Sequence, residues 1–413
     1  MTALPVPGAL PGWGPADRTG LDPVDGGMTA ARGAQAAGTT CGLKASGAPD
    51  LALLVTPPET TAALVTTDNR VKAPCCTVSA QHAADGRARA VVVNSGNANV
   101  ATPDDLAHTH RMVAATAAAT GVPAEQVLVM STGVIGVPLP VERIEAALPD
   151  LAGALSPDGG PDAARAMLTT DTRTKQVAYR VTDEHGVCTI GGAAKGVGMI
   201  EPSMATMLAV ITTDAPIHGQ LLRQLLRTAV GRTFNRISVD GDTSTSDQVA
   251  LLATGQVRQP PGLDTLQRAV EAVCADLAHQ VVADGEGAER VAAVTVSGAT
   301  DEDTAARLAR TVATSLLVRA ALHGADPNWG RVLMALGGAG VDLDPRRVHV
   351  RLAGHTVCRF GVGVTFDAGQ VSAAMDRPQV TVDVEVGAGP GHATVLTCDL
   401  TPEYVRFNAE YTT

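Results

Sequence analysis

The residues best suited to covalent chemistry lie near the middle of the chain, in a stretch that begins at Lys195 and reads Lys-Gly-Val-Gly-Met-Ile-Glu-Pro-Ser-Met-Ala-Thr-Met-Leu. Its glycines give the backbone freedom, and Pro202 prevents a helix from running through it. The apolar run 207–211 predicts a buried strand or helix start that would hold Thr206 on a rigid element. A lone threonine in such a place is structural more often than catalytic, so the pattern alone favours an ordinary loop.

This stretch resembles the self-processing site of the ornithine acetyltransferases, also called glutamate N-acetyltransferases. The resemblance implies that the precursor cuts itself between Ala205 and Thr206, and that Thr206 becomes the nucleophile. A hydroxyl that attacks the preceding carbonyl forms an ester, and its hydrolysis leaves a threonine with a free α-amine. An α-amine has an ordinary pKa of about 7.7–8.0, so it can act near neutrality as general base for its own hydroxyl.

A second stretch, residues 127–136, reads Val-Leu-Val-Met-Ser-Thr-Gly-Val-Ile-Gly and predicts a buried strand that ends in a turn of small residues. Taken alone, it is a tight turn. Its Ser-Thr-Gly-Val-Ile-Gly portion matches a motif of the same family, in which a threonine hydroxyl and a glycine N–H stabilise the tetrahedral oxyanion. The resemblance therefore assigns Thr132 and Gly133 to an oxyanion hole, which acyl transfer requires.

The resemblance also assigns substrate-binding residues in the first half of the chain. Residues 166–172 are similar to a family motif in which one threonine of a pair contacts substrate. The sequence does not decide between Thr169 and Thr170, although we favour Thr170, and consecutive threonines would also suit a β-strand. Lys195 is assigned to a substrate carboxylate, which its ammonium would hold as a point charge. Without the resemblance, a lysine that enters a glycine loop is a solvated residue.

The second half of the chain supplies three further assigned residues. Glu286, within Asp-Gly-Glu-Gly, is matched to the positively charged end of ornithine, and a polar helix end with flanking glycines is the structural alternative. Asn408 and Thr413 lie in an ending that matches the family's ending, so the resemblance implies that both reach the pocket. The last residues of a chain are ordinarily frayed. The polar block 236–247 is expected to be mainly structural.

The arrangement of apolar runs predicts a mixture of strands and helices. Strands are expected at 51–55, 62–65, 90–94 and 127–136, and helices at 107–120, 141–148, 221–233, 263–282 and 305–322. The resemblance implies an α/β fold, the layered α/β sandwich shared by ornithine acetyltransferases and β-peptidyl aminopeptidases, with two interwoven fragments. Self-cleavage would give an α chain, 28–205, after a disordered Pro/Gly-rich extension, 1–27, and a β chain, 206–413.

The composition is that of a globular protein with a large core, because 45% of the 413 residues are hydrophobic. A net charge of −11 without a basic cluster argues against nucleic-acid binding. Only 2% of the residues are aromatic, so there are few rings on which bases could stack. The seven cysteines are odd in number and lack Cys-x-x-Cys spacing, which indicates buried thiols in a reducing compartment.

Residues 1–27 hold five prolines but no basic start followed by a long apolar run, which indicates a disordered extension and not a signal peptide. No stretch approaches the ~20 apolar residues of a membrane-spanning helix, so we expect a cytoplasmic protein without a membrane partner. His108 and His110 stand two apart on a predicted helix and point away from each other, so they do not converge on one ion. Neither a metal nor a cofactor is expected.

The implied activity is ping-pong acetyl transfer, in which Thr206 takes acetyl from N-acetylornithine, ornithine leaves, and glutamate accepts the group. The implied assembly contains two α and two β fragments. Two alternatives stay open: an aminopeptidase or amidase on the same scaffold, and a catalytically silent amino-acid-binding paralogue. Departures from the family at Val197, Glu201 and Ser203 leave open whether the pathway is arginine biosynthesis or specialised metabolism. The sequence does not decide whether acetyl-CoA is also a donor.

Overall fold

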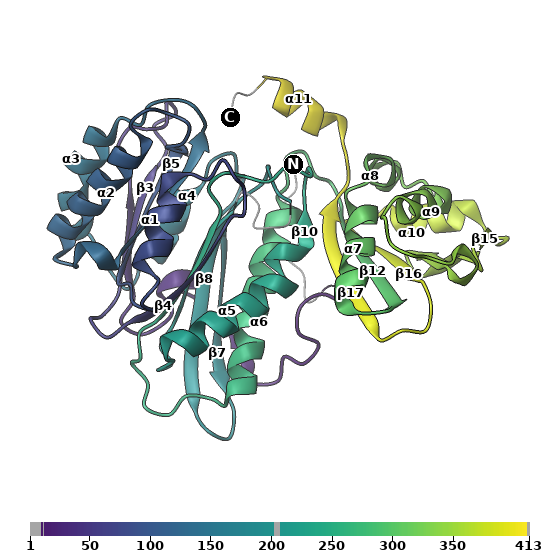
Figure 1. The fold of residues 1–413 in the computed structure, drawn as a ribbon, viewed down its shortest axis with the longest axis horizontal. Helices are drawn as coiled ribbons and strands as arrows, with labels where there is room; N and C mark the ends of the chain where they lie inside the picture. Colours follow the sequence, from purple (N-terminus) through teal and green to yellow (C-terminus); the bar gives the residue numbers. More distant parts are fainter. Residues whose placement is uncertain (1–9, 11, 202–206, 411–413) are drawn as a thin grey trace. The chain divides into compact units, whose positions relative to one another are not determined.

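The computed structural model describes residues 10, 12–201 and 207–410 (Figure 1). In this part of the chain there are two compact units, and each is discontinuous in sequence. The larger unit includes Asp17–Asn235 and Asp242–Leu277, and the smaller unit includes Arg236–Gly241, residues 278–410 and the described residues before Asp17. Each unit has a hydrophobic core of its own.

Two sheets form the centre of the larger unit. Their strand orders are β1-β7-β8-β9-β11-β4 and β2-β3-β5-β6. The strands of the first sheet are β1 Leu21–Pro23, β4 Thr61–Thr66, β7 Lys175–Thr182, β8 Val187–Lys195, β9 Leu208–Thr213 and β11 Gln248–Ala253, and those of the second are β2 Gln35–Thr39, β3 Leu51–Val55, β5 Ala90–Asn97 and β6 Val127–Val134. Val93 and Met130 from one sheet share a buried core with Val210 and Leu252 from the other. The sheets therefore pack face to face.

Helices cover the outer face of the four-stranded sheet. The helices of the larger unit are α1 Pro74–His82, α2 Asp105–Thr120, α3 Val141–Gly153, α4 Gly160–Met167 and α5 Gly219–Arg232, and α6 Leu263–Ala283 begins in this unit. Cys76 of α1, Met112 of α2 and Ile144 of α3 pack with Leu53 and Val129 of the sheet. Figure 1 shows these three helices beside the sheet. Strands β3, β5 and β6 are covered on both faces, and this explains why their sequences are continuous apolar runs.

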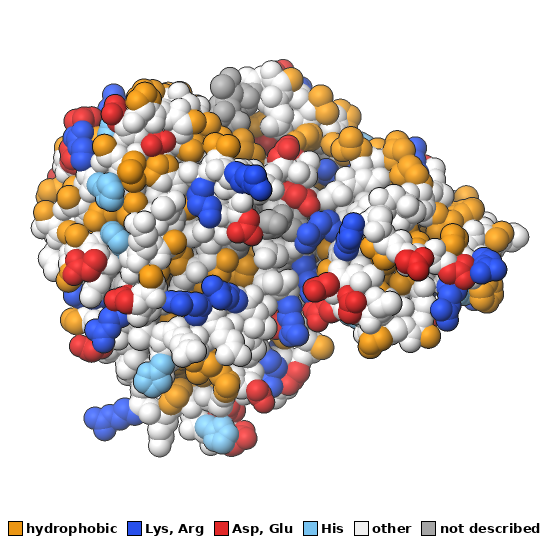
Figure 2. Space-filling view, in the orientation of Figure 1, with side chains coloured by type: hydrophobic (Ala, Val, Ile, Leu, Met, Phe, Trp, Pro, Cys, Tyr) orange, Lys and Arg blue, Asp and Glu red, His pale blue; other side chains and the backbone are white. Residues whose placement is uncertain are grey.

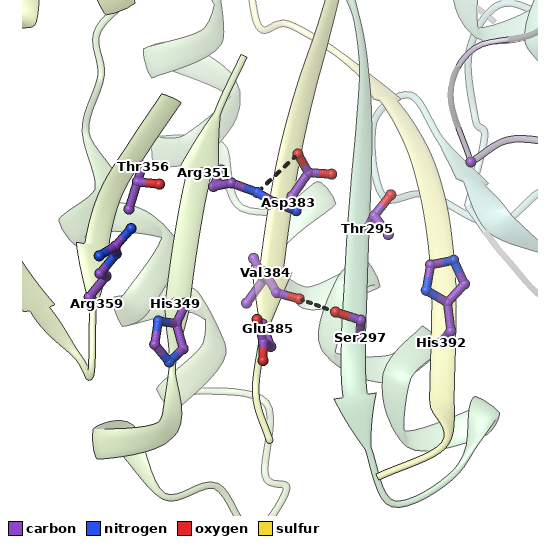
Figure 3. Close-up of a pocket in the computed structure, with 11 residues that line it drawn as sticks. Thr295, Ser297, His349, Arg351, Thr356, Arg359, Asp383, Val384, Glu385 and His392 are labelled. Atoms are coloured by element: carbon purple, nitrogen blue, oxygen red, sulfur yellow. Dashed lines mark hydrogen bonds and ion pairs between the residues drawn. The ribbon is translucent and has the colours of Figure 1, made fainter. Parts of the chain in front are cut away.

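The smaller unit is built on a seven-stranded sheet of order β10-β17-β12-β16-β13-β14-β15. Its strands are β10 Ile237–Ser238, β12 Val291–Ala299, β13 His349–Leu352, β14 His355–Arg359, β15 Val362–Gly363, β16 Gln379–Glu385 and β17 Gly391–Cys398, and its helices are α7 Glu302–Ala313, α8 Leu316–His323, α9 Trp329–Gly337, α10 Ala368–Met375 and α11 Pro402–Glu410. One face carries the core. The other face presents polar side chains such as Arg351, Asp383 and His392 (Figure 3). This alternation of apolar and polar faces is typical of a half-buried sheet.

The predicted α/β class is confirmed, and so is the strand at 51–55. The single helix predicted over 305–322 is wrong, because α7 ends at Ala313 and α8 begins at Leu316. The Thr314 hydroxyl donates to the carbonyl of Arg310 at 3.0 Å, and the Ser315 hydroxyl accepts the N–H of Val318 at 3.4 Å. Serine at this position caps a new helix instead of continuing the old one.

The predicted disorder of 1–27 is wrong for residue 10 and residues 12–27, and residues 1–9 and 11 lie outside the described part. Leu10 and Trp13 are buried at 3% and 4% exposure. Strand β1 pairs antiparallel with β7, and the Arg18 guanidinium donates twice to Asp276 at 2.7 and 2.9 Å. The proline-rich composition suggested that this segment would stay disordered. Burial of a tryptophan and pairing of a strand instead offset the conformational entropy that the chain loses when it becomes ordered.

None of the helices in the described part of the chain has the length and apolar character needed to cross a bilayer. On the face of the molecule drawn in Figure 2, acidic and basic side chains are interspersed and do not form one extended basic surface. That face therefore lacks the electrostatic footprint of a nucleic-acid-binding protein.

Candidate active site

The larger unit brings Thr132 and Lys195 together from its two sheets. Thr132 lies near the end of β6, Lys195 is the last residue of β8, and each is 2% exposed. The Lys195 ammonium donates to the Thr132 hydroxyl, with 3.2 Å between Nζ and Oγ1. Because this hydroxyl accepts from lysine, its own proton can be donated elsewhere. The pair thus has the chemistry of an oxyanion donor with a cation behind it.

The backbone next to Thr132 can be formed only by glycine. Gly133 has a φ of 128°, a conformation that side-chain-bearing residues rarely adopt. A Cβ placed on Gly133 would lie 2.3 Å from the carbonyl carbon of Gly96, its partner on β5. This close approach fixes the end of β6 against β5. The oxyanion role of Thr132 and Gly133 stays a prediction.

A buried carboxylate that was not assigned from the sequence organises this site. Asp171 Oδ1 accepts from Lys175 Nζ at 2.6 Å and from the N–H of Gly196 at 2.8 Å, and the Asp171 and Lys175 side chains have no solvent exposure. Burial alone would raise the pKa of Asp171, but the ammoniums of Lys175 and Lys195 and the Gly196 N–H outweigh it and hold the pKa well below its usual range. Asp171 is therefore charged and fixes the backbone that follows Lys195.

The same carboxylate also holds the first threonine of the predicted substrate-binding pair. Asp171 Oδ2 accepts the N–H of Thr169 at 3.0 Å and lies 3.4 Å from its hydroxyl. Both Thr169 and Thr170 are partly exposed and remain within reach of a ligand. The Thr169 hydroxyl has a partner inside the protein, and the preference for Thr170 as the substrate contact stays a prediction.

The predicted cleavage residues, Ala205 and Thr206, lie outside the described residues, but the chain just after them is held firmly. The N–H of buried Met207 donates to Asp247 Oδ1 at 2.9 Å, and β9 then runs between β8 and β11 in the six-stranded sheet. Burial raises the pKa of Asp247 well above its usual range, against the opposing effects of the Met207 N–H and the charge of Lys195. Its Oδ2 is buried and has no hydrogen-bond partner in the described part of the chain.

Two of the assigned C-terminal residues meet in the smaller unit. Glu286 follows α6, and Asn408 lies on α11. The Asn408 amide donates to Glu286 Oε2 at 3.0 Å. Thr413 lies outside the described residues. The structure thus forms two clusters of the predicted residues, one in each unit: Thr132 with Lys195, and Glu286 with Asn408.

Sequence reasoning missed Asp171, Lys175 and Asp247 as members of the site. A compositional signal for Lys175 was present, because only four of the 31 basic residues are lysines, and Lys175 and Lys195 are two of them. Lysine carries a compact point charge on a flexible stem and does not substitute freely for arginine, so its use at two neighbouring positions of the site is informative. No comparable signal distinguished Asp247 from the other polar residues of its block.

Other polar groups of the smaller unit have different explanations. A cavity of about 420 Å³ on the open sheet face is lined by Arg351, Arg359 and Asp383 among others, with mixed charge (Figure 3). Elsewhere, donor atoms of Glu289, His323 and Asp399 lie within 4.8 Å of one another. The guanidinium of Arg290 approaches Asp399 Oδ2 to 3.9 Å and would oppose a metal cation there. Asp399 is thus engaged inside the protein, by Arg290 and by His323 Nδ1 at 3.2 Å from its Oδ2.

Comparison with known proteins finds similarity along nearly the whole chain. Residues 35–413 match the ArgJ family. The arginine biosynthesis bifunctional protein ArgJ of a Synechococcus species is 46% identical over 411 residues, covering 94% of this chain and 98% of the relative. The protein of the same name from Mycobacterium bovis is 44% identical over 396 residues, covering 93% and 96%.

Similar structures have also been solved. The crystal structure of the arginine biosynthesis bifunctional protein argJ from Bacillus halodurans is 33% identical with a TM-score of 0.47, and it covers 48% of this chain and 97% of that chain. An ornithine acetyltransferase from Mycobacterium tuberculosis, complexed with ornithine, is 40% identical with a TM-score of 0.41, and it covers 44% and 98%.

Proposed function

Because the chain belongs to the ArgJ family, we propose that it is a self-processing acetyltransferase that moves acetyl from N-acetyl-L-ornithine to L-glutamate in arginine biosynthesis. The observation that carries the proposal is the buried hydrogen bond between Lys195 and Thr132. It joins the predicted carboxylate-binding residue to the predicted oxyanion donor, in the unit that also holds Met207 just after the predicted nucleophile.

The first step is self-cleavage. The Thr206 hydroxyl attacks the carbonyl carbon of Ala205, the peptide C–N bond breaks, and the proton passes to the departing nitrogen, so that the acyl group moves to oxygen as an ester. Water then hydrolyses the ester. The products are a carboxylate on Ala205 and a free α-amine on Thr206, which now has a base beside its nucleophile.

The second step is acetyl transfer. Thr206 Oγ1 attacks the acetyl carbon while its α-amine takes the hydroxyl proton, and the Thr132 hydroxyl and Gly133 N–H stabilise the oxyanion. The α-amine returns the proton to the nitrogen of ornithine, which leaves an acetyl ester on Thr206. The neutral amine of glutamate attacks the carbonyl carbon of this ester and loses a proton to the α-amine. The ester C–O bond then breaks, Thr206 Oγ1 takes the proton from the α-amine, and N-acetylglutamate leaves.

Different residues bind the negative and the positive groups of the substrate. Lys195 holds the α-carboxylate, and Thr170, which directly precedes Asp171 in the chain, contacts the same substrate. The Glu286 carboxylate, oriented by Asn408, accepts the side-chain ammonium of ornithine. Thr413 is assigned to the same substrate pocket because it lies in the ending that matches the family's ending.

Three finer features belong to the same proposal. Two copies of each fragment form the assembly, and the protein works in the reducing cytoplasm, as its seven free cysteines suggest. The word bifunctional in the names of the relatives favours acetyl-CoA as a second donor, which would add synthesis of N-acetylglutamate.

Incubation of the purified protein with N-acetylornithine and glutamate tests the proposal. We expect ornithine and N-acetylglutamate in equal amounts. Ornithine with acetate would show a hydrolase on the same scaffold, and absence of turnover in a cleaved protein would contradict the proposed activity. Thr206→Ala is the matched control: it should remain one chain by intact mass and produce neither product. An uncut protein with full activity would overturn the N-terminal-threonine mechanism.

A further inference from the structure

Lysine is used sparingly in this chain, which has four lysines and 27 arginines among its 31 basic residues. Two of the four, Lys175 and Lys195, belong to the site described above. A third, Lys44, reaches the same region from a different part of the sequence. Burial lowers the pKa of Lys44, the charges of Asp50 and Asp171 raise it, and that of Lys195 lowers it.

The loop that carries Lys44 is built on a buried carboxylate. Asp50 is 0% exposed, and its oxygens accept the N–H groups of Cys41 at 2.6 Å, Leu43 at 2.6 Å and Lys44 at 3.0 Å. The Lys44 ammonium donates to the carbonyl of Pro49 at 2.6 Å. Three backbone bonds to one side chain hold this loop in a single conformation, so the ammonium is positioned and not merely tethered.

The lysine side chain lies against the strand next to the predicted oxyanion turn. A Cβ on Gly96 would be 3.1 Å from Lys44 Cγ, and Gly96 is the cross-strand partner of Gly133. The N–H of Ser95 donates to the carbonyl of Asp50 at 2.9 Å, which ties the loop to the same end of β5. Lys44 is partly exposed, and Pro49 takes one of its three donors. The remaining donors can serve a ligand.

The carboxylates around this turn already have partners inside the protein. Asp171 binds Lys175 and the N–H of Gly196, and the oxygens of Asp50 accept three backbone N–H groups. The Lys44 ammonium, in contrast, donates to a neutral group, the carbonyl of Pro49. A partly buried ammonium on a neutral partner favours a ligand that brings a carboxylate, because a charge-assisted hydrogen bond is stronger than a neutral one.

We propose that Lys44 binds the side-chain carboxylate of the acyl acceptor and so makes the enzyme prefer a dicarboxylic amino acid. This inference rests on the proposed function, in which glutamate is the acceptor and Lys195 holds its α-carboxylate. A donor with an ammonium side chain gains nothing from Lys44. The two half-reactions therefore use different residues to recognise side chains of opposite charge.

The test compares wild type with Lys44→Met, which removes the ammonium with little loss of volume. The first half-reaction is followed as ornithine release and acetylation of the fragment that begins at Thr206, by intact mass, and should change by less than about twofold. The second is followed with glutamate and, in parallel, glutamine as acceptor. Loss of a charge-assisted hydrogen bond should lower kcat/KM for glutamate on the order of 10- to 100-fold and leave glutamine unchanged.

Two controls separate recognition from folding. Lys44→Arg keeps the positive charge and should retain part of the preference for glutamate. Arg143→Met removes a guanidinium that donates to the carbonyl of Gly42 in the same loop, and it should leave the preference unchanged. Self-cleavage reports that each variant folds, and Lys44→Gln replaces Lys44→Met if the latter is not cleaved.

Each outcome is decisive for one hypothesis. Equal losses with glutamate and glutamine, an unchanged preference, or a slowed first half-reaction would overturn the role of Lys44. A wild-type protein that is cleaved but makes no N-acetylglutamate would contradict the proposed function itself. Selective loss of glutamate as acceptor supports the role of Lys44.

Discussion

At the scale of single residues, the site depends on charges that are held away from water. Asp171 and Lys175 form an ion pair with no solvent exposure, and the carboxylate also accepts the N–H of Gly196. A buried pair of this kind adds little net stability over an apolar pair of the same shape, but removal of one partner leaves an uncompensated charge. The pair therefore fixes the geometry of the site more than it stabilises the fold.

Replacement of Lys175 by methionine should lower the free energy of unfolding by about 3–5 kcal/mol, because Asp171 stays buried without its nearest cation. Chemical denaturation measures this. The matched control is Arg165→Met, which breaks an exposed pair with Asp162 whose side chains are 57% and 64% exposed, and which should cost less than about 1 kcal/mol. Similar losses in both variants would show that Asp171 does not depend on Lys175.

The depressed pKa of Asp171 predicts a loss of stability in acid. The folded state binds this proton less readily than the unfolded chain, whose Asp has a pKa of about 3.9. The contribution is therefore fully present above about pH 5 and falls as the pH drops through 3.9 toward the lower folded value. The difference in unfolding free energy between wild type and Asp171→Asn should shrink from pH 6 to pH 3.5. A difference that is constant or grows in acid would contradict the assigned shift.

Thr132→Ala should lower kcat for acetyl transfer by about 10²–10³-fold with a small change in KM, because an oxyanion donor acts mainly in the transition state. Steady-state kinetics with N-acetylornithine and glutamate measure both constants. Thr132→Ser keeps the hydroxyl and should retain most of the activity. If Thr132→Ala instead changed KM alone, the hydroxyl would be a binding group for the substrate and not an oxyanion donor.

The sequence located Thr132 and Lys195 because each lies in a motif, and the structure shows them in contact. It did not locate Asp171 or Asp247, since their importance comes from burial and from partners that only the folded chain provides. Lys44 was not located for the same reason. It lies 151 positions before Lys195, and its packing against Gly96 of β5 brings it close to the turn at Gly133.

At the scale of elements, the site depends on how closely β5 and β6 approach at their ends. These strands are parallel, and their register shifts at Gly96 and Asn97, where the chain leaves the ladder. The single helix predicted across Ser315 was wrong because a serine can either stand inside a helix or cap the start of one. The amino-acid sequence is the same in both cases, and only the backbone geometry distinguishes them.

Gly133→Ala should abolish self-cleavage or destabilise the fold strongly. The residue has a φ of 128°, and the added Cβ would lie 2.3 Å from the carbonyl carbon of Gly96, which is backbone and cannot move aside cheaply. Gly136→Ala is the matched control, because Gly136 has a φ of 77° and nothing within 4 Å of an added Cβ, so only strain of about 1–2 kcal/mol is expected. Intact mass and thermal unfolding compare the two. Equal tolerance of both substitutions would show that the approach of the strands is not fixed.

At the scale of the whole molecule, the predicted fragments and the compact units do not coincide. A cut between Ala205 and Thr206 falls inside the larger unit. It places β9 and β11 on one fragment and β1, β4, β7 and β8 on the other, although all six belong to one sheet. The resemblance predicted interwoven fragments, and the strand order gives that expectation a physical basis.

The two fragments should therefore stay associated after cleavage and separate only when the protein unfolds. Six residue pairs join β8 to β9, from Ile190↔Thr213 to Lys195↔Leu208, and six more join β11 to β4. All six residues of β9 and all six of β11 are buried, so separation would expose apolar strands and unpaired ladder groups on both fragments. Because self-cleavage only adds one water, native mass spectrometry should show the full 42.0 kDa of the chain or a multiple of it. Denaturing electrophoresis should show two bands, whereas Thr206→Ala gives one band. Fragments that separate in native buffer and keep their far-UV circular dichroism would contradict the shared sheet.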